Sequence, residues 1–397
     1  AQECVSISFS TQRRDCYSLK GLVVQRQSLD FRSHSHLFGE ADFKRLYRLS
    51  KADFRTLVSL LEPDLRRTQR FNTIASSVEP NIMIAVSLRF PAGAKALDLG
   101  WPYGLALSIV YAVIHDTLDV INNSPSLDNI KFPTSRQNCC QEAAAFQTLR
   151  GSPMYGFIAA LDGIAIAIRC PTAAESADAR KYFNRKGFFD ISVQAADSAS
   201  YRVTFLSAKH AGSTHDSTAF TSTVLYDHLS VSENDGGLPS WAVVAADDAY
   251  GNRSAGGRII TPFSERNLDT EKDSFNFYLS SIRITVEQVF GVIVSRWGIL
   301  WSPLRCSLRR ATRTIAVCAK LHNFIIDERC SRGDSVDFND ITSPDMDNQL
   351  EGEPEIFLQD CLHVDGEIAR HIRQGPGALR NELSHELKVL GLRGPAR

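Results

Sequence analysis

The sequence lacks the motifs on which several common enzyme classes depend. It contains no Gly-x-x-x-x-Gly-Lys phosphate loop, no Gly-x-Gly-x-x-Gly dinucleotide fingerprint and no His-Glu-x-x-His metal helix. It also contains no Gly-x-Ser-x-Gly elbow of the kind that carries a serine nucleophile. These absences exclude the standard nucleotide-loop, dinucleotide-cofactor, zinc-protease and serine-hydrolase classes.

Net charge of either sign is also nearly absent. The 397 residues include 44 basic and 45 acidic side chains, which leaves a formal charge of −1 at pH 7. An overall positive field is therefore excluded, and any contact with nucleic acid must come from local basic patches. The nine cysteines form no Cys-x-x-Cys pair and no zinc-type spacing, so we expect free thiols in a reducing compartment, the cytosol or the nucleus.

Long apolar runs are missing as well. No run approaches the roughly 18 to 20 residues that span a bilayer, so no membrane partner is expected. Because the chain opens on Ala1 rather than Met, we expect the natural N-terminus to lie upstream. The length favours two lobes. Composition divides the chain into a poorly ordered extension (1–40), a helical lobe (41–150), a mixed domain (151–330) and an acidic flexible segment with a closing helix (331–397).

The helical lobe rests on apolar residues at helical spacing. In "LSKADFRTLVSLLEPDLRR", Phe54, Leu57 and Leu61 recur at intervals of three and four, which predicts an amphipathic helix. The later segment "ALSIVYAVIHDTLDVI" is also helical in pattern. We therefore expect an all-helical N-terminal lobe.

From residue 155 the pattern changes to segments rich in Val, Ile, Phe and Ala between turn residues. Three successive strands are predicted, in "YGFIAALDGIAIAIRC", "FFDISVQAADS" and "YRVTFLSAKHAG". A helix from Ser217 to His228 follows, and then "WAVVAA" has the continuous apolar character of a strand that is covered on both faces. Two further helices are expected over 275–301, where apolar residues recur at steps of four, three and four, and over 307–327.

Four acidic residues stand out against this frame. Period-two counting places Asp162 on the buried side of its strand, and Asp247 follows "WAVVAA" at the carboxyl end of another. Glu287 lies one residue from the apolar stripe of its helix, and Asp216 opens a helix.

Each acid also has an ordinary structural explanation. Asp162 and Asp247 are compatible with turn or cap aspartates, and Asp216 with a carboxylate that stabilises a helix N-terminus. Glu287 is compatible with an i, i+4 ion pair to Arg283. The residues Ser213, His215 and Asp216 are too close along one turn to take the mutual geometry of a hydrolase triad.

Taken together, the acids indicate metal-dependent phosphoryl transfer. Two strand aspartates and a helical glutamate, Asp162, Asp247 and Glu287, are the set with which a ribonuclease-H-like nuclease holds two Mg²⁺ ions. Carboxylate oxygens suit Mg²⁺ or Mn²⁺, and the lack of a Cys/His cluster argues against zinc. The predicted fold class is therefore α/β, a ribonuclease-H-like mixed sheet with flanking helices, preceded by the all-helical lobe.

Five motifs occur in order over about residues 155–327: "ALDGIAI", "AGSTHDSTAF", "ADDAY", "FNFYLSSIRITVEQVFGVIVSRW" and "CAKLHNFIID". In this order they resemble the DDE superfamily endonucleases of the PIF/Harbinger type, the Harbinger transposase-derived nucleases. The resemblance implies a divalent-metal nuclease acting on DNA. It assigns metal binding to Asp162, Asp216, Asp247 and Glu287, with the first, third and fourth of these as catalytic residues.

The resemblance also decides between two neighbouring aspartates. The Tyr spacing in "DDAY" places the family's aspartate at Asp247, and Asp248, of opposite strand parity, is expected to face outward. The segment "WPYGLALSIVYAVIHDTLDVI" lies in the place of a helix-turn-helix, although its second half offers no Arg or Lys to DNA.

One departure from the family supports a second hypothesis. The family usually continues its first aspartate as Asp-Gly-Thr-His, whereas Ile164 and Ala165 follow Gly163 here. Loss of polar groups beside a metal would impair catalysis. The alternative is therefore a domesticated, catalytically silent transposase-derived protein that binds DNA or protein.

A group of arginines follows the glutamate helix. We predict phosphate contacts for it, the alternative being a solvated helix face. Its members are Arg296, Arg305, Arg309, Arg310 and Arg313. Expected partners are DNA, a separate DNA-binding protein and a further copy of this chain, with the nucleus as location.

Overall fold

The structure is a computed structural model that describes residues 31–68, 78–150, 154–251, 255–265, 268–334, 378–389 and 392. It divides into two compact units, residues 1–117 and 118–397. Residues 1–30 of the predicted extension and 335–377 of the predicted acidic segment lie outside the described residues.

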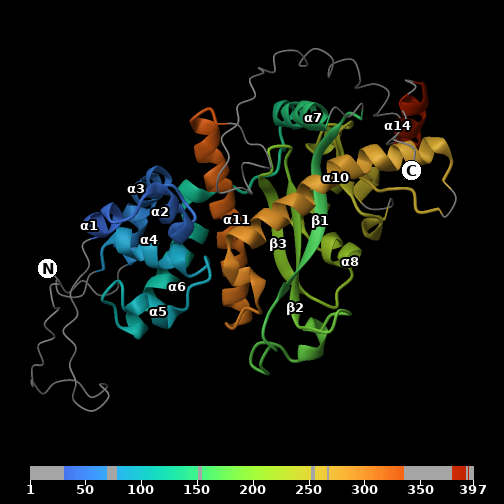
Figure 1. Cartoon of the computed structure of the whole chain (residues 1–397). Coiled ribbons are helices and arrows are strands. Elements are labelled where there is room, and N and C mark those ends of the chain that lie inside the picture. The colour runs from blue at the N-terminus through green and yellow to red at the C-terminus, as the bar shows by residue number, and fades with distance from the viewer. Residues whose placement is uncertain are drawn as a thin grey trace, which may run out of the picture. The chain divides into compact units, whose positions relative to one another are not determined.

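The described part of the first unit is helical throughout, as predicted. Aromatic and aliphatic side chains that recur at helical spacing form its core, among them Phe43, Tyr47, Phe54 and Leu57, all at most 3% exposed. The hydroxyl groups of Tyr47 and Tyr103 share a hydrogen bond of 2.8 Å. Its helices are α1 (Phe31–His36), α2 (Glu40–Tyr47), α3 (Lys51–Thr68), α4 (Pro80–Arg89), α5 (Ala96–Gly100) and the first part of α6 (Leu107–Asn123) (Figure 1).

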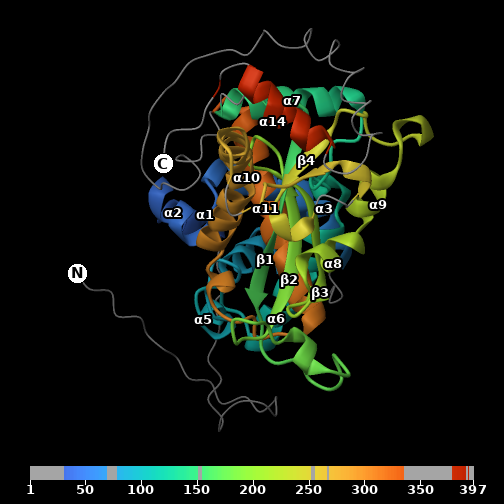
Figure 2. The same cartoon turned by 90° about the vertical axis from the view of Figure 1, so that its right-hand side faces the viewer.

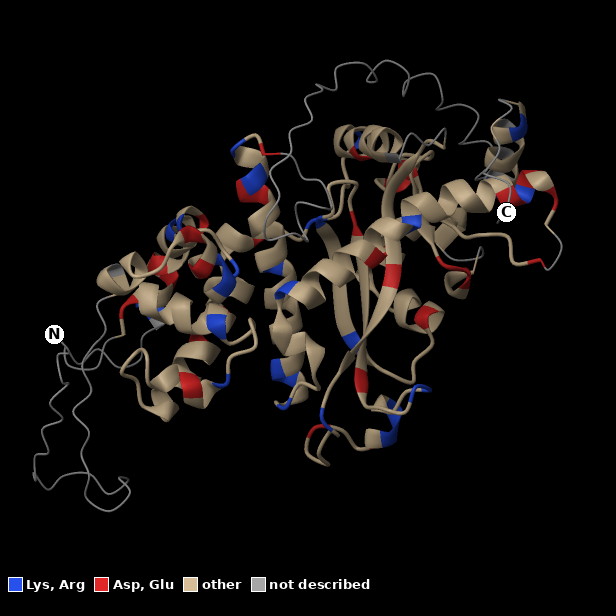
Figure 3. Cartoon of the chain, viewed as in Figure 1, with Lys and Arg blue, Asp and Glu red and all other residues tan. Residues whose placement is uncertain are grey.

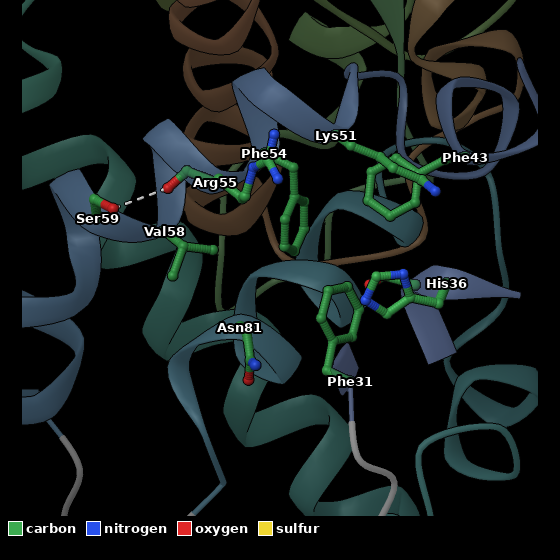
Figure 4. A pocket seen from close by; sticks show the side chains of 10 residues that line it. Phe31, His36, Phe43, Lys51, Phe54, Arg55, Val58, Ser59 and Asn81 are labelled. Atoms are coloured by element: carbon green, nitrogen blue, oxygen red, sulfur yellow. Dashed lines mark hydrogen bonds between the residues drawn. The ribbon is translucent and has the colours of Figure 1, made fainter. Parts of the chain in front are cut away.

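A cavity of about 700 Å³ opens in this unit, lined by residues of α1, α2, α3 and α4. Figure 4 shows the rings of Phe31, Phe43 and Phe54 turned toward this space, with Lys51 and Arg55 above them. The Lys51 ammonium group donates a hydrogen bond of 2.6 Å to the Phe38 carbonyl. The cavity holds none of the predicted catalytic residues.

The second unit is built on a five-stranded mixed sheet with the order β3-β2-β1-β4-β5. Strands β1, β2 and β3 pair antiparallel in succession, and β4 and β5 extend the sheet in parallel on the other side of β1. The four strands expected from the sequence are confirmed. The bounds are β1 (Phe157–Ala167), β2 (Asp190–Asp197), β3 (Val203–Ala211), β4 (Val243–Ala246) and β5 (Ile259–Ile260).

Helices cover the sheet. Helix α10 packs against β1, β2 and β4, α7 packs against β1, and α11 packs against β3. Figure 2 shows α14 crossing above α10, and the two helices are in contact, with Lys388 of α14 paired to Glu271 at the N-terminal end of α10. The bounds are α7 (Arg136–Arg150), α8 (Asp216–Thr221), α9 (Val224–Ser230), α10 (Thr270–Arg296), α11 (Leu308–Ser331) and α14 (Ala378–Val389).

Two differences from the expected elements have local causes. The single helix expected from Ser217 to His228 is divided into α8 and α9, because the Thr223 side chain accepts from the amide of Tyr226 at 3.2 Å and starts a new helix. The second unit begins at Leu118 and so includes α7, which the division by composition had placed with the helical lobe.

Helix α10 is the one described helix that is long and apolar enough to cross a membrane by length and composition. Its apolar stripe lies on the sheet, however, and Ile282, Val286 and Val289 are at most 1% exposed. This burial is typical of a core helix. The second unit is therefore an α/β domain with a mixed sheet and flanking helices, the arrangement of the ribonuclease-H-like fold.

Candidate active site

The two strand aspartates lie side by side, Asp162 within β1 and Asp247 directly after β4. The parallel register pairs Leu161 of β1 with Ala246 of β4. Asp162 and Asp247 are the next residues on these strands, and neighbouring strands lie about 4.8 Å apart. Asp247 is half-buried at the end of β4, and Asp248 is exposed, as expected for the outward member of the pair.

Helix α10 carries Glu287 across the same part of the sheet. Arg283, one turn earlier, places its Nη2 atom 3.5 Å from the Glu287 carboxylate and 3.4 Å from that of Asp247. The i, i+4 pair anticipated as the ordinary explanation of Glu287 is therefore present, and the same guanidinium also reaches the strand aspartate. Figure 3 shows acidic positions on β1 and α10 close together near the middle of the sheet.

Electrostatics connect Asp162 to both acids. Burial raises the pKa of Asp162 to about 6, and the negative charges of Glu287 and Asp247 act in the same direction. The Gly163 amide, which donates to Asp162 at 2.8 Å, and the nearby Arg283 oppose the shift. The raised pKa means that the ionised form of Asp162 is destabilised in this site. A bound cation would stabilise that ionised form.

Asp216 is joined to the sheet by two residues that the sequence reasoning missed. Gln194 of β2 donates from Nε2 to Asp216 at 3.0 Å, and its own carbonyl accepts from the Tyr250 hydroxyl at 2.5 Å. Asp216 is the first residue of α8, as predicted, and its charge lies in the first turn. It is not the cap, however, because His215 is the N-cap residue and makes no side-chain cap hydrogen bond. Burial raises the pKa of Tyr250, and Asp162, Asp216 and Asp247 add to the effect.

The signal for these two residues was available. Gln194 is a fully buried amide in the middle of β2, and such a group requires a partner. Tyr250 closes the "DDAY" motif, and its hydroxyl is the donor that meets this amide.

Gly163 leaves no room for a side chain, which makes a testable prediction. An added Cβ would lie 2.7 Å from Oδ1 of Asp216 and 2.8 Å from Nε2 of Gln194. We expect Gly163→Ala to break the hydrogen bond between these groups and to lower the free energy of unfolding by about 1 to 3 kcal/mol in urea denaturation. Gly291→Ala on α10 is the control, since nothing lies within 4 Å of its Cβ. Equal stability of both variants would contradict the crowding.

A second cavity, of about 410 Å³, opens beside this network. Gly163 and Asp216 line it on one side, and Arg185 and Lys186 from the loop before β2 line it on another. Ser213 and His215 also face it, but the His215 ring is hydrogen-bonded to Ser217 at 2.9 Å rather than to Ser213.

The predicted arginine group is not uniform. Arg305, Arg309 and Arg310 are exposed around the start of α11. Arg313 is paired with Asp119, and Arg296 lies 3.4 Å from Nδ1 of His322. Three of the five arginines, Arg305, Arg309 and Arg310, are therefore exposed and can contact a phosphate.

The donor set fits a hard divalent cation in its chemistry, because the acids offer only oxygen. Over the ranges that the structure describes, however, no three His, Cys, Asp or Glu side chains are gathered as a closed metal site. Arg283 lies between two of the acids instead. The six cysteines in these ranges are all free, as expected.

A mixed sheet of this order, with acids from two central parallel strands and a crossing helix, is the frame of the ribonuclease-H-like phosphoryl-transfer domains. Residues 161–323 match the family model of the DDE superfamily endonucleases. The matched range includes all four predicted acids, and it supports a transposase-like nuclease domain that acts on DNA. Neither the curated proteins nor the solved structures give a match.

Proposed function

We propose that this protein is a divalent-metal-dependent DNA endonuclease of the PIF/Harbinger type, which cleaves phosphodiester bonds by a two-metal mechanism. One observation carries the proposal. Asp162 lies within β1 and Asp247 directly follows the parallel strand β4 beside it, and Arg283 joins Asp247 to Glu287 on the helix that crosses these strands. Three acids from distant parts of the chain are thereby brought to one place.

In this proposal Asp162, Asp247 and Glu287 are catalytic and hold Mg²⁺ or Mn²⁺ together with Asp216. The bound cations would neutralise phosphate charge and activate water or a 3′-hydroxyl. Gln194 orients Asp216 through its amide and is itself fixed by Tyr250. These two residues are therefore positioning residues for the fourth acid.

The proposed substrate is DNA. The exposed Arg305, Arg309 and Arg310 would contact its phosphates, a sequence-independent interaction that weakens as salt rises. A separate DNA-binding protein would supply sequence recognition, a further copy of this chain would complete a homo-oligomer, and the nucleus would be the site of action.

A specific observation favours the catalytically silent alternative. Ile164 and the exposed Ala165 follow Gly163 on β1, so no polar side chain continues the strand beyond Asp162. Groups that orient metal ligands typically contribute about 10- to 100-fold to affinity or activity. We therefore expect cleavage by this site to be slower than in proteins that have polar side chains after the first aspartate.

Metal removal tests the function. We expect nicking of supercoiled plasmid in Mn²⁺ or Mg²⁺, its loss in excess EDTA, and its return when Mn²⁺ is added back, because without a bound cation the clustered carboxylates repel the phosphate and its developing charge is not neutralised. DNA binding measured in EDTA serves as the control. Binding without cleavage in either metal would favour the silent alternative in its DNA-binding form. Neither binding nor cleavage would overturn both the nuclease and that DNA-binding form.

A further inference from the structure

Arg283 occupies an unusual position among the acids. Its side chain is 16% exposed, and its guanidinium faces Asp247 and Glu287 at 3.4 and 3.5 Å. Its positive charge also acts on Asp162. One largely buried cation therefore contacts two carboxylates and acts electrostatically on a third.

The contacts of Arg283 are loose for a structural ion pair. Both exceed the 2.7 to 3.2 Å typical of an N–H···O hydrogen bond. Its Nε atom is buried and has no hydrogen-bond partner. In the same unit, by contrast, Arg169 holds Glu175 through hydrogen bonds of 2.7 and 2.8 Å. Arg283 is thus held mainly by charge, and it leaves a buried donor unsatisfied at a cost.

The charge balance points the same way. A single guanidinium faces the carboxylates of Asp247 and Glu287, and its charge also acts on Asp162, so the three acids carry a formal excess of negative charge even without a contribution from Asp162. A divalent cation supplies more charge in a smaller volume, and carboxylate oxygens are its preferred ligands. Arg283 and a metal ion would therefore compete for the same oxygens.

From this geometry we infer that Arg283 is a built-in substitute cation, which holds Asp247 and Glu287 in place without metal and is displaced from them when a divalent cation binds. The inference rests on the proposed function, because it assigns a cation to this cluster. Because the two cations compete, the free energy by which Arg283 stabilises the metal-free cluster reduces the free energy of metal binding by the same amount.

The test is Mn²⁺ affinity, measured by isothermal titration calorimetry on the full chain without DNA. Arg283→Gln should bind Mn²⁺ about five- to tenfold more tightly than the unmodified chain, the lower end of typical coupling between two ligands. Arg283→Lys keeps the charge and should remain within about twofold of the unmodified chain. Arg66→Gln is the matched control, since Arg66 forms an i, i+4 pair with Glu62 in the other compact unit.

A second readout protects the test against misfolding. The melting temperature of metal-free Arg283→Gln should fall, and Mn²⁺ should raise it by more than in the unmodified chain, because tighter binding gives a larger shift. Mn²⁺ affinity that is unchanged or weaker in Arg283→Gln overturns the inference and leaves the proposed function standing, provided that the unmodified chain binds Mn²⁺. No Mn²⁺ binding by any variant or by the unmodified chain overturns the metal site itself.

Discussion

Asp247→Asn should reduce Mn²⁺-dependent plasmid nicking by at least about 100-fold, because loss of a group that only orients a metal ligand already costs about 10- to 100-fold. The substitution keeps the shape of the side chain and removes its charge. Asp247 lies at the end of β4 beside Asp162, and it is one of the two acids that Arg283 reaches. The next acid along the chain, Asp248, is exposed.

The adjacent aspartate supplies the control. Asp248→Asn changes the net charge by the same amount, but Asp248 is exposed and is the first residue of a short 3-10 helix, Asp248–Tyr250. Its nicking rate should stay within about twofold of the unmodified chain, since exposed substitutions away from special features have small effects. Equal loss in both variants would contradict the choice of Asp247, and so would a greater loss in Asp248→Asn.

Much of the frame could be predicted from the sequence because each element repeats a simple pattern. The continuous apolar run before Asp247 could only be a strand covered on both faces, and Val243–Ala246 is fully buried. The apolar stripe of the 27-residue helix α10 likewise predicts a helix. Strand β5 has only two residues, too few for any period, so it was missed.

The interior of the site was less accessible to sequence reasoning. Glu287 and Arg283 are spaced as an i, i+4 pair, and that spacing is all that the helix shows by itself. Only the packing of α10 on β1 and β4 brings Asp247 within reach of the same guanidinium. The Gln194 amide likewise signals that it needs a partner, but only the placement of β2 and α8 shows that this partner is Asp216. Contacts between elements carry this information, and local patterns do not.

The "Leu-His-Asn" part of "CAKLHNFIID" acquires a structural meaning from α11. Asn323 is fully buried and faces the first residue of the edge strand β3. Its Oδ1 accepts from the Val203 amide at 2.8 Å, and its Nδ2 donates to the Val203 carbonyl at 2.7 Å and to the Asn129 carbonyl at 2.9 Å. The preceding His322 bonds the Tyr201 carbonyl at 2.8 Å.

The Asn323 side chain thus forms hydrogen bonds with both the amide and the carbonyl of Val203. An edge strand has no second neighbour to take unpaired groups, and burial keeps water from Val203, which is 1% exposed. Burial also lowers the pKa of His322 to about 3, so His322 is neutral at pH 7 and serves as a hydrogen-bond donor rather than a charge. The motif therefore fastens α11 to the edge of the sheet.

Asn323→Ala should lower the free energy of unfolding by about 3 to 5 kcal/mol, because it leaves two buried backbone groups unpaired at about 1 to 3 kcal/mol each and opens a small cavity. The measurement is urea denaturation followed by circular dichroism, with the transition midpoint compared at an unchanged slope. Asn138→Ala, on the exposed side of α7, is the matched control and should shift stability by no more than about 0.5 kcal/mol. Similar midpoints for the two variants would show that β3 does not depend on Asn323.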